Sequence, residues 1–76
     1  MTEPTAKRIL AELTAIRKQQ KVTQKELSHR LFVDATFVSR YERGCRVPTI
    51  ATLERMASAL GYELEINLRE RVEIAK

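Results

Sequence analysis

The sequence predicts a small, mainly α-helical protein of four helices, followed by one C-terminal β-strand. Apolar residues recur every three or four positions from Ile9 to Leu60, a spacing typical of helices packed around one core. Residues that favour helix starts and ends divide this region into four segments. After Gly61 the apolar period changes to two, which is typical of a half-buried strand.

The first helix is expected to begin near residue 2 or 3 and to end near Gln20. Pro4 suits its first turn, because the N–H that proline lacks has no helical partner there. Arg17 lies on the same predicted face as the apolar side chains. Those side chains are Ile9, Leu10, Leu13 and Ile16.

The second helix is expected to start at Thr23. Thr23 and Glu26 have the spacing of a capping box, in which a hydroxyl and a carboxylate each satisfy a free N–H. Leu27 and Leu31 form its apolar stripe, and a tight connection is expected at Phe32–Val33.

Asp34 is the expected N-cap of the third helix, and Gly44 its end. Val38 and Tyr41 are expected to face inward. Thr49 is the expected cap of the fourth helix, which stops at Gly61. One face of the fourth helix should carry Ile50, Leu53, Met56, Ala57 and Leu60.

A strand is predicted over residues 62–68, where apolar and polar side chains alternate. The chain offers no second strand, and an unpaired strand leaves its N–H and C=O groups without partners. We therefore expect pairing with the same strand of a second copy. The expected interface residues are Tyr62, Leu64, Ile66 and Leu68. An edge strand on its own helices and a fifth helix are the alternatives. Residues 69–76 have no clear pattern.

The charge is unevenly distributed. Residues 1–48 hold ten lysines and arginines against five acidic residues, whereas residues 49–76 hold four against five. A basic first part suggests a polyanionic partner, with nucleic acid first.

Several classes of protein are disfavoured. Cys45 is a single cysteine, so no internal disulfide is expected, and its default role is that of an inert thiol. His29 has no Cys/His cluster around it and is not expected to bind metal. No membrane span, signal peptide, cofactor motif or enzyme active site is evident, so we expect a cytoplasmic protein that is not an enzyme and needs no cofactor.

The segment TQKELSHRLFVDATFVSRYERG, residues 23–44, has two short helices joined by a tight turn. It resembles the phage Cro and repressor type of helix-turn-helix, the XRE family. The resemblance extends from about Ile9 to Gly61. Two positions depart from the family: Phe32 stands where glycine is usual and Ser28 where alanine is usual. Phe32 must either adopt a strained positive φ or change the turn. The matching residues are Gln24, Glu26, Leu27, Val33, Val38, Ser39, Glu42, Gly44, Pro48, Thr49, Leu53, Ala57, Leu60 and Gly61.

The resemblance implies a four-helix DNA-binding domain in which the third helix enters the major groove of double-stranded DNA. Gln24 is similar to a family glutamine that binds phosphate, and Arg40 can bond a guanine. Thr36 can meet a base edge or a thymine methyl group, and Arg43 and Arg46 are similar to phosphate clamps. The complete set of expected DNA-binding residues is Thr23, Gln24, Lys25, Ala35, Thr36, Phe37, Ser39, Arg40, Arg43 and Arg46.

A further expectation concerns Arg17 and Glu42. Both charges lie on predicted core faces, and an unpaired buried charge is very costly. The family has a matching pair at these positions, so the two side chains are expected to form a buried ion pair.

Two functions remain open. The first is a homodimeric repressor on a palindromic operator. The second is an antitoxin that binds a toxin protein and autoregulates its operon, because residues 61–68 resemble the region after helix four in HipB-type antitoxins. We expect residues 1–61 to bind DNA and residues 62–76 to dimerise.

Overall fold

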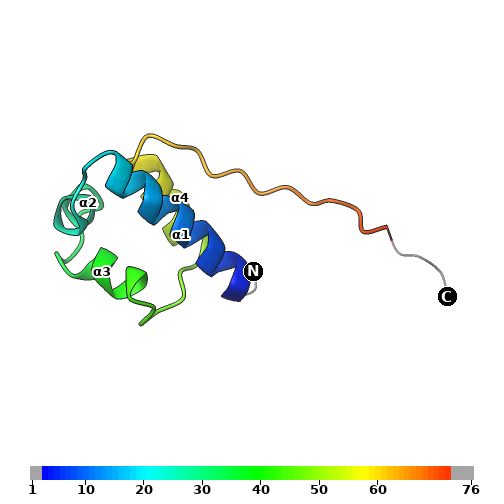
Figure 1. Cartoon of the computed structure of the whole chain (residues 1–76), viewed down its shortest axis with the longest axis horizontal. Coiled ribbons are helices and arrows are strands. Elements are labelled where there is room, and N and C mark those ends of the chain that lie inside the picture. Colours follow the sequence, from blue (N-terminus) through cyan, green and yellow to red (C-terminus); the bar gives the residue numbers. More distant parts are fainter. Residues whose placement is uncertain (1–2, 73–76) are drawn as a thin grey trace.

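The structure is a computed structural model that describes residues 3–72. Four α-helices form a bundle: α1 (Glu3–Gln19), α2 (Gln24–Arg30), α3 (Phe37–Glu42) and α4 (Ile50–Ala59). α1 and α4 lie side by side, and α2 and α3 pack against each other next to this pair (Figure 1). Beyond α4 the chain leaves the bundle as an extended segment (Figure 1). No helix of residues 3–72 has the length and apolar character that a membrane crossing needs.

One hydrophobic core joins all four helices. Leu27 and Val38 bring α2 and α3 into it, and both are almost completely buried. Ile50, expected on the core face of α4, is instead 40% exposed, because it begins that helix at the rim of the bundle. The other core side chains are Leu10, Leu13, Val22, Leu31, Tyr41, Leu53, Met56, Ala57 and Leu60.

Threonine caps start two of the helices, as predicted. The Thr23 hydroxyl accepts a hydrogen bond from the Glu26 N–H at 2.9 Å, and the Thr49 hydroxyl accepts one from the Thr52 N–H at 3.2 Å. The carboxylate of Glu26 is engaged by Arg30 at 2.9 Å, one turn further along α2. A hydroxyl at these positions satisfies an N–H that the helix itself leaves without a partner.

The third helix starts later than predicted. It begins at Phe37, and its N-cap residue Thr36 makes no side-chain cap. Asp34 instead folds residues 34–36 into a turn, because its carboxylate accepts from the Thr36 N–H at 2.9 Å. The cap of α3 comes from another helix: the buried Ser28 hydroxyl accepts from the Val38 N–H at 3.1 Å. The expectation that Asp34 caps the third helix is therefore wrong.

All four helices end with the same backbone motif. A residue with positive φ follows each helix, and the N–H after it bonds to the carbonyl five positions back, as in a Schellman motif. The positive-φ residues are Lys21 (61°), Phe32 (60°), Gly44 (84°) and Gly61 (85°). The bonds join Val22 to Arg17, Val33 to Ser28, Cys45 to Arg40 and Tyr62 to Ala57, at 2.8–3.1 Å.

The predicted C-terminal strand is wrong. Residues 62–72 form no strand, and the described part of the chain is all-helical apart from turns and extended segments. The alternating pattern keeps the backbone extended, but a strand also needs a hydrogen-bonded neighbour, which residues 3–72 do not supply. Leu64 packs against the core, whereas Leu68 is 102% exposed.

Candidate nucleic-acid interface

α2 and α3 form a supported pair of short helices. Leu27 and Leu31 of α2 and Val38 and Tyr41 of α3 are buried in the same core. The Ser28 hydroxyl links the two helices through the Val38 N–H. These contacts leave the other side of α3 at the surface, on one edge of the molecule (Figure 1).

The exposed side of α3 carries several of the expected DNA-binding residues. Ala35, Thr36 and Arg40 are exposed, and Arg40 lies one helical turn beyond Thr36. Ser39 is half-buried and its hydroxyl donates to the Thr36 carbonyl at 3.1 Å. Phe37 is also half-buried, with its ring edge-on to Tyr41 at 5.1 Å between centroids. Phe37 therefore supports the core side of α3 and offers only part of its ring to a partner.

Thr36 has a defined side-chain orientation. Its hydroxyl donates to the Asp34 carboxylate at 2.7 Å, and its N–H donates to the same oxygen at 2.9 Å. Hydrogen bonds from the Thr36 hydroxyl and N–H hold the pKa of Asp34 below its usual value, with a smaller contribution from the positive charge of Arg40. Asp34 is therefore a carboxylate at neutral pH that orients an exposed side chain of this surface.

Two further arginines flank the C-terminal end of α3. Arg43 is exposed, and its Nε donates to the Ser39 carbonyl at 3.4 Å. The guanidinium of Arg46 lies over the Tyr41 ring, 5.5 Å from its centre. Both keep a charged group at the surface beside α3.

The start of α2 contains the remaining expected residues. Lys25 and Thr23 are exposed, and the Thr23 hydroxyl is also the helix cap. The Gln24 amide donates to the Glu42 carboxylate at 2.8 Å. Gln24 is thus tied to the end of α3, and its amide oxygen can still accept a hydrogen bond.

The predicted ion pair of Arg17 and Glu42 is confirmed. The guanidinium donates two hydrogen bonds to the two carboxylate oxygens, each 2.9 Å long, and each side chain is only 9% exposed. Arg17 also donates to the Val22 carbonyl at 2.7 Å. Burial raises the pKa of Glu42, but hydrogen bonds from Arg17 and Gln24 outweigh burial and lower it below the usual value. This network joins α1, α2 and α3.

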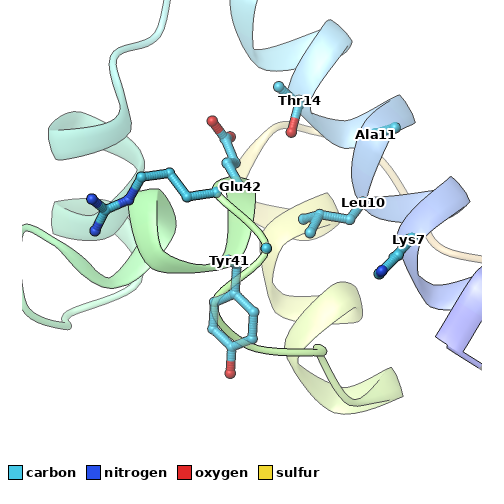
Figure 2. Close-up of a pocket in the computed structure, with 8 residues that line it drawn as sticks. Lys7, Leu10, Ala11, Thr14, Tyr41 and Glu42 are labelled. Atoms are coloured by element: carbon cyan, nitrogen blue, oxygen red, sulfur yellow. The ribbon is translucent and has the colours of Figure 1, made fainter.

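A hollow of about 400 Å³ lies between α1 and the end of α3. Figure 2 shows Lys7, Leu10 and Thr14 of α1 on one side and Tyr41 and Glu42 of α3 on the other. Its floor is largely apolar and Glu42 already has its partners, so the hollow holds no group in need of a ligand. Within residues 3–72, no group of three or more His, Cys, Asp or Glu side chains could hold a metal ion.

Two residues that orient this surface, Asp34 and Ser28, are not among the site residues that the sequence predicts. Asp34 stands where a helix cap is expected, although an aspartate two positions before a threonine can also signal a local side-chain bond. Ser28 shows in the sequence only as a departure from a family pattern. Its bond to Val38 joins residues ten positions apart and depends on how α2 and α3 pack.

A family model described as "Helix-turn-helix" matches residues 13–67. The immunity repressor protein of Bacillus phage phi105 is 30% identical in an alignment of 79 positions, which covers 84% of this chain and 55% of the repressor. The chain thus spans about half the length of the curated relative it matches. No solved structure matches the chain.

Proposed function

Since the chain belongs to the XRE-type helix-turn-helix family, we propose that it is a sequence-specific DNA-binding transcriptional regulator that acts as a repressor. The observation that carries this proposal is the exposed face of α3, where Thr36 and Arg40 stand on a helix held by the buried Arg17–Glu42 pair. The similarity to a phage immunity repressor supports the direction of regulation. Such a protein acts in the cytoplasm, where the DNA is.

In the proposed mechanism, α3 contacts the bases and the residues around it contact the phosphates. α3 enters the major groove, where Arg40 donates two hydrogen bonds to a guanine and Thr36 meets a neighbouring base. Around it, hydroxyl, amide and cationic groups contact phosphates and set the position of α3 without reading the sequence. These phosphate-binding residues are Thr23, Gln24, Lys25, Arg43 and Arg46.

The proposal includes a homodimer on a palindromic operator. Tyr62 and Ile66 are half exposed and Leu68 is fully exposed, so the extended segment offers apolar surface to a second copy. Leu64 packs against its own core and supports the segment from within. Residues 1–61 would then bind DNA and residues 62–76 would dimerise. Two copies would place their recognition helices about 34 Å apart, one turn of DNA.

An antitoxin role is the second candidate function. The observation that favours it is the same exposed apolar segment, because Leu68 and Val72 could also be covered by a different protein. Co-purification with the product of the adjacent gene decides between the two functions. A stable complex that suppresses a toxic kinase or nuclease would support the antitoxin role, and a homodimer alone would support the repressor.

Gel-shift titration of duplexes selected from a random pool tests the DNA-binding function. Affinity should fall steeply with salt, because several phosphate contacts release counterions. Arg40→Ala should reduce the free energy of DNA binding by roughly 1–3 kcal/mol and relax specificity at one base position. Arg43→Ala should weaken binding to all duplexes alike. Lys18→Ala removes one positive charge from an exposed position of α1, outside both proposed surfaces, and is the matched control. Wild-type protein that shows no salt-dependent duplex binding would contradict the proposal.

A further inference from the structure

Thr36 has a hydroxyl and a methyl group on the same carbon, and either could face a base in the major groove. The hydroxyl carries a single hydrogen, and that hydrogen is directed to the Asp34 carboxylate at 2.7 Å. A hydrogen bond to a carboxylate is charge-assisted and is stronger than one to a neutral acceptor. Thr36 would therefore have to give up a strong bond in order to donate to a base.

The same bond determines where the methyl group lies. Threonine is branched at Cβ, so an oxygen held toward Asp34 leaves the methyl group in one staggered position. The turn of residues 34–36 is held by a second bond, from the Thr36 N–H to the same carboxylate oxygen at 2.9 Å. Thr36 is an exposed residue, so a partner can reach its side chain without a change in the turn.

Arg40 and Thr36 offer different chemical groups to a base pair. The Arg40 N–H bonds to the Thr36 carbonyl at 3.0 Å, so the two side chains follow each other along one face of the helix. Arg40 brings only hydrogen-bond donors, which suit the acceptors of guanine. Thr36 brings a methyl group, and its hydroxyl hydrogen is already donated to Asp34, which suits contact with the apolar C5-methyl group of thymine.

We propose that Thr36, oriented by Asp34, is a specificity-determining residue that selects thymine through methyl–methyl contact and not through a hydrogen bond. This inference rests on the proposed DNA-binding function. Asp34 is a positioning residue: its carboxylate does not contact the base. It binds the Thr36 hydroxyl, which would otherwise be free to donate a hydrogen bond to the base. An operator half-site should therefore contain one thymine whose C5-methyl group matters, close to the guanine bound by Arg40.

The test replaces each thymine of a selected duplex, one at a time, with deoxyuridine, which lacks only the C5-methyl group. With the full wild-type chain, one position per half-site should weaken binding about fourfold, the effect expected for one buried methyl group. Thr36→Val has a methyl group at both branches of Cβ, so one lies at the required position without the bond to Asp34, and this sensitivity should be kept. Thr36→Ser keeps the hydroxyl and should lose it. Asp34→Ala should reduce it, because the side chain of Thr36 is then free to rotate.

The opposite pattern would overturn the inference: sensitivity lost in Thr36→Val and kept in Thr36→Ser would show that the hydroxyl reads the base. Duplex binding with no thymine position sensitive to deoxyuridine would also overturn it, while leaving the DNA-binding function intact. Absence of salt-dependent duplex binding would contradict that function itself. Thr36 and Asp34 are exposed, and circular dichroism of each variant verifies that the fold is retained.

Discussion

At the scale of single residues, the position of α3 depends on a buried charge pair. Arg17 donates two bonds to Glu42 and a third to the Val22 carbonyl, so both charges are compensated where water is largely excluded. Gln24 adds a bond to the same carboxylate from α2. Thr36 and Arg40, which would meet the bases, are exposed, but the ion pair that holds α3 is buried.

Removing one member of this pair should strongly destabilise the protein. Arg17→Ala leaves the Glu42 carboxylate buried without its main partner, and we expect a loss of about 3–5 kcal/mol in the free energy of unfolding. Urea denaturation followed by circular dichroism measures it. Arg8→Ala is the control, because Arg8 and Glu12 form an ion pair at 3.5 Å in which both side chains are about two-thirds exposed. Equal effects of the two substitutions would contradict the importance of the buried pair.

The ionisation of Glu42 should make stability depend on pH. Its pKa is lower in the folded state than its ordinary value of 4.5, so below that value the unfolded state binds more protons. The stabilisation is fully present above the unfolded pKa and is lost as pH falls through the folded pKa. Urea denaturation from pH 6 to pH 3 should show this loss in the wild type and a shallower decline in Glu42→Gln. The lowered pKa of Asp34 acts in both proteins, so parallel curves would argue against the role of Glu42.

At the scale of secondary-structure elements, the helix ends determine the turns. The same motif closes all four helices, although glycine occupies the positive-φ position in only two of them. Basic and amide side chains from other helices satisfy carbonyls at these ends. Arg55 donates to Leu31 at 2.6 Å, Arg30 to Ala59 at 3.0 Å and Gln20 to Leu60 at 2.8 Å. The ends of α2 and α4 are thus stabilised by contacts between helices as well as by local backbone bonds.

Phe32 is the clearest case of strain at a helix end. It has a φ of 60° in the α2–α3 turn, and its side chain is 93% exposed, so no packing compensates. Phe32→Gly should raise the free energy of unfolding by up to about 1 kcal/mol, because relief of the left-handed penalty exceeds the entropy that glycine adds to the unfolded chain. Chemical denaturation measures it. Phe32→Ala keeps the strain and should show no gain. A similar gain in both would mean that loss of the ring, and not φ, is responsible.

At the scale of the whole molecule, the bundle and the extended segment present different surfaces. The exposed side of α3 carries Thr36 and Arg40. Exposed apolar side chains occur at the start of α4, at Ile50, and along the extended segment, at Tyr62, Ile66, Leu68 and Val72. The extended segment leads away from the bundle (Figure 1). Ile50 and Ile66 line one hollow of about 460 Å³ together with α1 residues. A second copy that covered this surface would leave α3 free for DNA.

The dimer proposal gives a prediction at Ile66. Ile66→Lys places a charge in the surface that the second copy would cover, so the protein should become monomeric and lose operator affinity together. Sedimentation at micromolar concentration and gel shift measure the two effects. Phe32→Lys changes another exposed apolar residue to lysine, in the α2–α3 turn, and should remain dimeric. An Ile66→Lys protein that stays dimeric would exclude this surface as the interface.

The four helices, most of their core and the family follow from local sequence patterns. Helical periodicity and caps such as Thr23 and Thr49 act within one or two turns, so they can be recognised without knowledge of the fold. The Arg17–Glu42 pair was predictable because two buried charges must find each other. The sequence also shows that Phe32 replaces the glycine usual in the family. It does not show that Phe32 adopts a positive φ.

The cap of α3 and the contacts at its two ends depend on tertiary packing. Ser28 caps α3 only because α2 packs against it, and Gln24 reaches Glu42 only because the ends of the two helices meet. The alternating pattern of residues 62–68 could not show whether a neighbouring strand exists. In the described chain it does not, and the segment is extended without a ladder. Local patterns specify the backbone shape that a segment favours, whereas hydrogen-bond partners depend on which distant residues the packed core brings together.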